Sequence, residues 1–182
     1  MATLFVVVTG PPASGKSTLA RELAAALGVP HLSKDVFKET LYDALAGEGL
    51  SRRTLDAAAF ALLVRLADAQ LRAGVAVLVE SDFDGDSEAE PIRELVRRHD
   101  VRAVQIHATR APAHLLAEFA ERARSGERHP VHDDDLADFR RRLDAGGWAP
   151  LDVPGESLEV DQDADPLSAI AIARRLAVVA SR

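Results

Sequence analysis

The chain has 182 residues, no cysteine and a formal net charge of −7. This length is most simply one domain, 1–182, and the absence of cysteine excludes disulfides and thiolate metal sites. The acidity argues against a protein that coats extended nucleic acid, although binding of a nucleic-acid 5′ end stays open.

The first strand-like run begins at Thr3, with no basic segment before it, so no secretory leader is expected. No apolar run approaches the roughly 20 residues that a membrane-spanning helix needs. We therefore expect a cytoplasmic protein with no membrane partner.

Strand-like and helix-like segments alternate along the chain. Strands are expected at 3–9, 29–33, 75–79, 101–107 and 157–161. Helices are expected at 18–27, 34–46, 52–73, 88–99, 113–124 and 166–179, with one more that is capped by 133–135 and runs to about 145. This alternation predicts an α/β fold with a doubly wound, mainly parallel sheet of five strands. In helix 34–46, the apolar stripe is expected to be Val36, Leu41 and Leu45.

A complete G-x-x-x-x-G-K-S phosphate loop, residues 10–17, separates the first strand from the first helix. Its two glycines let successive backbone amides point at one phosphate, and the helix N-terminus adds partial positive charge. Lys16 is expected to reach the β- and γ-phosphates and Ser17 to bind Mg²⁺. The nucleotide is expected to be ATP, with GTP as the alternative. The expected nucleotide-binding residues are Gly10, Ala13, Ser14, Gly15, Lys16, Ser17 and Thr18.

The residues that follow the second strand are candidates for holding the phosphoryl acceptor, because ligands bind beyond the carboxyl ends of parallel strands. Lys34 and Asp35 stand there, with Lys38 one helical turn later. Asp35 can take a proton from an attacking hydroxyl, although an aspartate here also suits a helix cap. Lys34 and Lys38 can hold the acceptor.

The segment after the third strand carries Glu80 and Asp82. Either can order Mg²⁺ through water, contact substrate or lie on a surface loop. We assign Asp82 to both the metal and the substrate. Residues 82–85 also match the D-x-x-G of GTP-binding switches, but no N-K-x-D motif follows. A nucleotide-binding regulatory NTPase is therefore the weaker alternative.

Three arginines, Arg122, Arg124 and Arg128, lie where a helix runs into a glycine-containing loop. Phosphoryl transfer needs cations near the migrating oxygens, and a segment that closes over the substrate can deliver them. We expect a lid around 122–134 with one of these arginines as a catalytic group. The alternative is that they only compensate the dipole at the helix C-terminus.

Taken together, the segments 10–20, 32–38 and 121–126 resemble those of the small P-loop kinases, a group that includes polynucleotide 5′-kinase, chloramphenicol phosphotransferase and zeta toxins. The resemblance covers almost the whole chain. It implies the strand order 2-3-1-4-5, Asp35 as general base, Lys38 as a contact to a substrate phosphate and a lid arginine. The implied activity is ATP-dependent transfer of the γ-phosphoryl group to a hydroxyl of a small molecule, nucleotide or nucleic-acid end. A polynucleotide 5′-hydroxyl kinase in nucleic-acid repair is a further alternative.

Overall fold

The computed structural model describes residues 2–83, 85–126, 128–132, 135–164 and 169–179. Some expectations fall partly outside these residues. They are the helix cap at 133–134, the lid at 127 and 133–134, the D-x-x-G pattern at its third position, Asp84, and the start of the last helix at 166–168.

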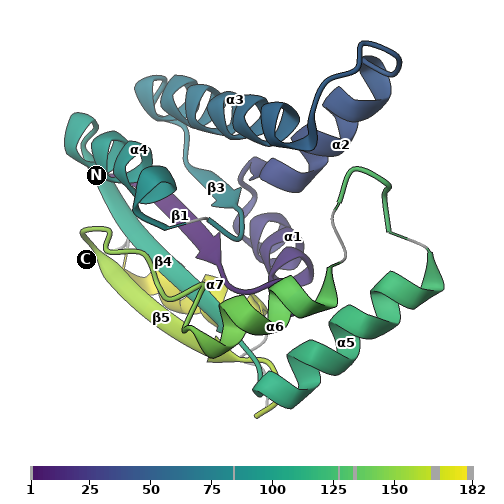
Figure 1. Ribbon diagram of the computed structural model, residues 1–182. Coiled ribbons are helices and arrows are strands. Elements are labelled where there is room, and N and C mark those ends of the chain that lie inside the picture. Colours follow the sequence, from purple (N-terminus) through teal and green to yellow (C-terminus); the bar gives the residue numbers. More distant parts are fainter. Residues whose placement is uncertain (1, 84, 127, 133–134, 165–168, 180–182) are drawn as a thin grey trace.

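The described strands form one sheet in the order β2-β3-β1-β4-β5, and every neighbouring pair is parallel. This confirms the predicted α/β fold, the doubly wound sheet and its strand order (Figure 1). The strands are β1 (Thr3–Thr9), β2 (His31–Ser33), β3 (Val77–Glu80), β4 (Val101–Thr109) and β5 (Glu156–Asp161).

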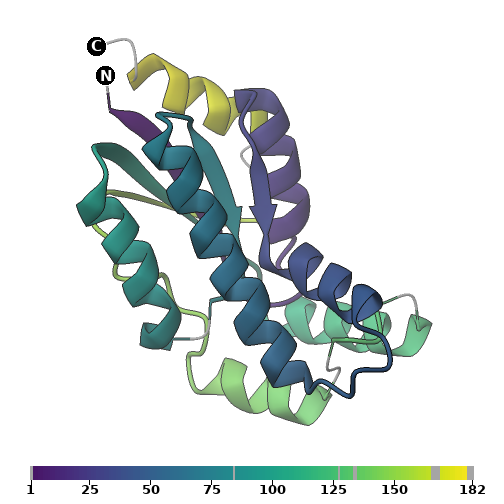
Figure 2. The ribbon, with the colours of Figure 1, turned by 90° about the horizontal axis from the view of Figure 1, so that it is seen from above.

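Helices cover both faces of the sheet and also its carboxyl edge. One face carries α1 (Lys16–Leu27) and α7 (Ala169–Val179), and the other carries α3 (Arg52–Arg72) and α4 (Gly85–Arg98). Beyond the carboxyl ends of the strands lie α2 (Lys34–Ala44), α5 (Pro112–Ser125) and α6 (Leu136–Asp144), as Figures 1 and 2 show. In the part of the chain that the structure describes, no helix combines the length and apolarity needed to cross a membrane.

The central strand β1 explains why both faces are covered. Its side chains alternate, so Val6 and Val8 pack with α1 and α7, whereas Phe5 and Val7 pack with α3 and α4. All four are at most 1% exposed. An uninterrupted apolar strand of this kind is stable only between two helical layers.

A third apolar cluster joins α5 and α6 to the phosphate loop. The rings of Phe119 and Phe139 are stacked, with 4.2 Å between their centroids, and Trp148 lies 5.2 Å from Phe139. Ala13 of the phosphate loop is buried in the same cluster. Helix α5, which runs into the expected lid segment 122–134, and helix α6, which follows that segment, are therefore docked against the phosphate loop.

Helix α2 differs from its predicted pattern. Val36 is 55% exposed and Leu45 is 38% exposed, whereas Phe37 packs against the core on the α3 side of the sheet. The reason is the position of α2, which lies beyond the sheet edge over a cavity rather than on a sheet face. Val36 lines that cavity instead of a core.

Candidate active site

The phosphate loop has the backbone shape that its glycines predict. Gly10 has φ +145°, and a Cβ at this position would stand 2.3 Å from the carbonyl oxygen of Ala108 on β4. Gly15 has φ +85° and is the N-cap residue of α1. Ala13 also has a positive φ, 70°, which is uncommon for a residue with a side chain. The loop therefore requires glycine at position 10, because β4 approaches it closely.

A cavity of about 530 Å³ opens in front of this loop, at the carboxyl edge of the sheet. Pro12, Ala13, Lys16 and Ser17 line it from the loop. The first-turn amides of α1 have no acceptor within the helix, so they are available to a bound phosphate. The amide of Ser14 is used within the loop, where it donates to the carbonyl oxygen of Pro11 at 3.2 Å.

A buried carboxylate at the end of β3 ties the phosphate loop to β2. Ser17 Oγ donates to Glu80 Oε1 at 3.0 Å, and Ser33 Oγ donates to Glu80 Oε2 at 2.8 Å. Burial opposes the charged form of Glu80, but His31, Lys16 and the two hydroxyls together keep its pKa below the usual range. The Ser17 hydroxyl is therefore bonded to Glu80, and the assignment of Asp82 to the metal stays a prediction.

Asp35 lines the same cavity from the first turn of α2. The N-cap position of this helix is Ser33, so the cap that an aspartate could have formed is not the role of Asp35. Burial raises the pKa of the Asp35 carboxyl and Asp82 adds to this effect, while Lys16 acts in the opposite direction. A carboxylate with a raised pKa that faces a cavity is suited to accept a proton.

Both lysines of α2 that the sequence singles out are in ion pairs. The Lys34 side chain is 4% exposed, and its Nζ lies 2.8 Å from Glu88, 3.1 Å from Asp56 and 3.8 Å from Asp82. Burial lowers the pKa of Lys34, but these carboxylates together raise it above its ordinary value. Lys38 Nζ lies 3.0 Å from Asp56 Oδ1.

Asp56 and Glu88 were missed by the sequence analysis. They lie near the N-terminal ends of two helices, α3 and α4, at spacings that match no motif. Asp82, which the sequence placed in the substrate site, does line the cavity. Its partial burial opposes the charged form, but Lys16 and Lys34 keep the pKa of its carboxyl low.

The expected lid arginines separate into two groups. Arg122 and Arg128 line the cavity, and Arg128 lies 5.8 Å from the centre of the Phe119 ring. Arg124 forms an ion pair with Glu121, has a side chain that is 73% exposed, and is not among the described residues that line the cavity. Only the first two are thus placed to meet a ligand.

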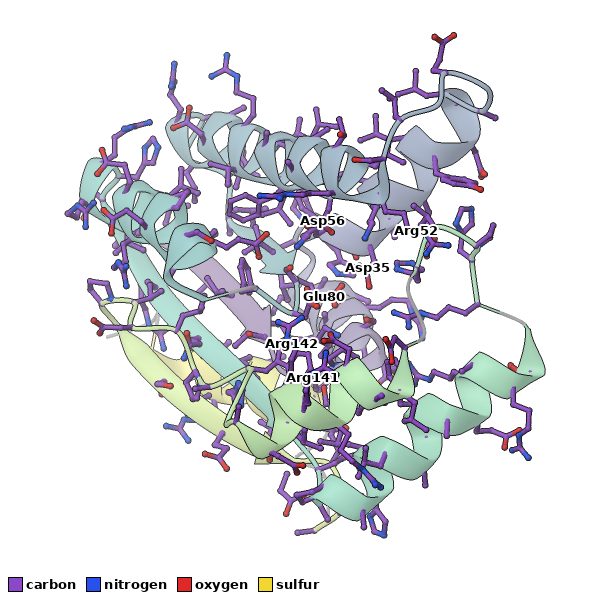
Figure 3. All side chains as sticks on the ribbon, in the orientation of Figure 1. Asp35, Arg52, Asp56, Glu80, Arg141 and Arg142 are labelled. Atoms are coloured by element: carbon purple, nitrogen blue, oxygen red, sulfur yellow. The ribbon has the colours of Figure 1, made fainter. Side chains whose placement is uncertain are left out.

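A fourth arginine, Arg142 of α6, was missed by the sequence analysis. Its guanidinium lies 4.4 Å from the centre of the Trp148 ring, it lines the cavity, and it contributes to the low pKa of Asp82. Figure 3 shows Arg142 on the side of α6 that faces Glu80. Its neighbour Arg141 has a side chain that is 70% exposed and pairs with Asp138. No sequence signal distinguishes the two arginines, because they differ only in their tertiary contacts: Arg142 packs on Trp148 and Arg141 does not.

The loop between α5 and α6 is tied to α2 and α3 by polar contacts. His132 Nε2 lies 2.8 Å from Glu39 Oε1, and His129 Nε2 lies 3.2 Å from Asp43 Oδ1. Arg52 Nη2 donates to the carbonyl oxygen of Pro130 at 3.1 Å. Together with the aromatic cluster, these contacts hold the α5–α6 region over the cavity.

A parallel sheet in this order, with a phosphate loop after its central strand and helices over its carboxyl edge, defines a P-loop nucleotide-binding protein of the kinase-like type. Residues 5–145 match the family described as "AAA domain", and the chain belongs to that family. The relatives below place it among the kinase-like P-loop proteins, as the sequence resemblance implied.

Similar proteins carry kinase names. The "Cytidylate kinase" of Brucella suis is 34% identical over 116 residues, which are 64% of this chain and 52% of that protein. The chain thus spans about half the length of the curated relatives that it matches. A solved "putative kinase" from Chloroflexus aurantiacus is 30% identical, with 98% of each chain covered and a TM-score of 0.84. Kti12 of Chaetomium thermophilum, solved with ADP-AlF3, shares the fold at 18% identity and a TM-score of 0.66, with 96% of this chain and 97% of that chain covered.

Proposed function

We propose that this protein is an ATP-dependent phosphotransferase that moves the γ-phosphoryl group to a hydroxyl of its acceptor. The observation that carries the proposal is Asp35, a carboxylate with a raised pKa that faces the phosphate-loop cavity. An alcohol must lose a proton as it attacks the γ-phosphorus, and a positioned carboxylate takes it. A phosphate acceptor is largely deprotonated at pH 7 and needs no such base.

In the proposed reaction, the hydroxyl oxygen bonds to the γ-phosphorus while the bond from that phosphorus to the β–γ bridging oxygen breaks. The proton passes to Asp35, and ADP leaves with the electron pair of the broken bond. Lys16 and the first-turn amides of α1 hold the phosphates. Arg142, with Arg122 or Arg128, faces the oxygens of the migrating group. Arg124 is not assigned a role.

Mg²⁺ would be held mainly by the nucleotide. Among the described residues no three histidines or carboxylates gather into a site that could enclose a metal ion. Mg²⁺ commonly keeps several waters and binds through one or two protein oxygens plus phosphate oxygens. The Ser17 hydroxyl and the Glu80 carboxylate, 3.0 Å apart, fit that requirement, with Asp82 as a further candidate through water. The ion would supply positive charge at the β- and γ-phosphates.

The test is the transfer of label from γ-labelled ATP to a panel of nucleosides, nucleoside monophosphates, sugars and 5′-hydroxyl oligonucleotides. The proposal expects a labelled product whose new phosphate is an ester of an alcohol, and expects Asp35→Asn to lose this product while still binding ATP. A second candidate function, transfer to a phosphate oxygen, is favoured by the name of the Brucella relative. Formation of a nucleoside diphosphate at the same rate in the protein and in Asp35→Asn would establish that candidate and overturn the proposal.

A further inference from the structure

The cavity has one wall whose lysines are already paired with carboxylates in the absence of any ligand. This α2–α3 wall consists of the cavity-lining residues Lys34, Asp35, Val36, Lys38, Glu39, Asp56 and Asp82. It holds two lysines against four carboxylates, and a fifth carboxylate, Glu88, lies directly behind it at 2.8 Å from Lys34 Nζ. Its formal charge is therefore negative before any substrate arrives.

Asp56 forms ion pairs with both lysines of this wall. Its Oδ2 lies 3.1 Å from Lys34 Nζ, and its Oδ1 lies 3.0 Å from Lys38 Nζ. Lys34 also contacts Glu88 and Asp82. An anion that approached either ammonium group would have to displace a carboxylate that is already there. It would also meet the remaining carboxylates at short range.

The cavity-lining arginines lie on the opposite side. Arg122, Arg128 and Arg142 belong to the α5–α6 region, whose aromatic cluster packs on Ala13 of the phosphate loop. That position suits them to the triphosphate, which brings several negative charges of its own. We therefore assign them to the nucleotide, although Arg142 also offsets part of the negative charge of Asp82 on the α2–α3 wall.

We propose that the acceptor is an uncharged, polyhydroxylated small molecule that binds the α2–α3 wall and carries neither a phosphate nor a carboxylate group. This inference rests on the proposed phosphotransferase function. Hydroxyl groups donate to carboxylates without adding charge, and Asp56 and Glu39 present side chains that are 36% and 37% exposed. Both carboxylates already have side-chain partners, Lys38 for Asp56 and His132 for Glu39, so they are oriented before the acceptor binds.

The experiment compares acceptors in pairs that share a skeleton and differ in charge, such as cytidine against cytidine 5′-monophosphate and glucose against gluconate. Transfer is measured with γ-labelled ATP. Binding is measured separately by calorimetry on protein saturated with Mg²⁺ and a non-hydrolysable ATP analogue. Within each pair, we expect the neutral member to bind more tightly and to receive the phosphoryl group faster than the anionic member. The expected difference is about tenfold or more in each quantity.

Asp56→Asn is the diagnostic variant, because it keeps the shape of the side chain and removes the negative charge that pairs with both Lys34 and Lys38. We expect it to shift selectivity towards the anionic member of each pair by about tenfold. Glu48→Gln is the matched control, since it removes one negative charge from an exposed position in the loop between α2 and α3. It should leave the ratio unchanged.

Stronger binding of the anionic member by the unmodified protein would overturn the inference, and so would an unchanged ratio in Asp56→Asn. Binding of no member of either pair would also count against it. If neutral members bind with the expected selectivity but receive no phosphoryl group, the charge inference holds and the proposed phosphotransferase function fails. The binding and transfer readouts thus separate the two claims.

Discussion

The phosphate loop and the α2–α3 wall face the same cavity but keep their shapes by different means. The loop is fixed by its backbone, through the close approach of Gly10 to β4 and the left-handed Gly15 at the start of α1. The wall is fixed by ion pairs between side chains from α2, α3, α4 and the segment after β3. A site formed by the backbone suits a ligand that many proteins bind, such as a phosphate. A site formed by side-chain ion pairs can acquire a different ligand preference through a single substitution.

The largest effect is expected at the loop, where Lys16 is 7% exposed and lines the cavity. Lys16→Ala should lower ATP turnover by at least about a hundredfold, because the lost cation is not replaced by solvent in a buried site. Calorimetric titration with ATP should show weakened binding, and circular dichroism should show an unchanged fold. Turnover within a few-fold of the unmodified protein would mean that the loop is not the phosphate site.

The backbone character of the loop is tested by Gly10→Ala. The added Cβ would stand 2.3 Å from the Ala108 carbonyl oxygen at a φ of +145°, so we expect a loss of about 2–3 kcal/mol in the free energy of unfolding. Gly28→Ala is the control, because Gly28 has φ +67° with no atom near its Cβ position, and it should cost about 1 kcal/mol. Urea unfolding measures both, and equal losses would contradict the close-approach argument.

The contribution of the α5–α6 region is tested by comparing two adjacent arginines. Arg142→Ala should lower the transfer rate by about tenfold, because this guanidinium lines the cavity and stacks on Trp148. Arg141→Ala removes an equal charge from the exposed side of α6 and should leave the rate nearly unchanged. Steady-state kinetics under saturating ATP would show the difference. A larger loss in Arg141→Ala would reverse the assignment.

The smallest effect is a gain in stability at the wall. Burial raises the pKa of Asp35 above its ordinary value of 3.8, so the folded protein binds this proton more tightly than the unfolded chain. The ionised carboxylate therefore destabilises the fold at all pH values above the raised pKa, and the penalty fades as the pH falls towards the ordinary range. Asp35→Asn should raise the midpoint of thermal unfolding at pH 7 and not at pH 3. A lower midpoint at pH 7 would contradict the direction of the pKa shift.

The contrast between the phosphate loop and the α2–α3 wall also explains which parts of the site could be predicted from the sequence. The phosphate loop lies within eight consecutive residues, and β1 is an unbroken apolar run, so both the fold and the nucleotide-binding segment could be predicted. Asp35 could be predicted as a cavity residue because it lies two residues beyond the end of a strand of a parallel sheet. Asp56, Glu88 and Arg142 could not, because each lies within a helix and reaches the site only through tertiary packing. Val36 was expected in the apolar stripe of its helix. It lines the cavity instead, because α2 lies beyond the sheet edge rather than on a sheet face.

The central claim is that Asp35 takes the proton from an acceptor hydroxyl opposite the phosphate loop. The most direct test is single-turnover transfer from γ-labelled ATP in the protein and in Asp35→Asn, with saturating ATP and Mg²⁺ and an acceptor identified from the neutral panel. We expect the variant to bind ATP normally and to transfer about 10²- to 10⁴-fold more slowly. Transfer within a few-fold of the unmodified protein would contradict the claim.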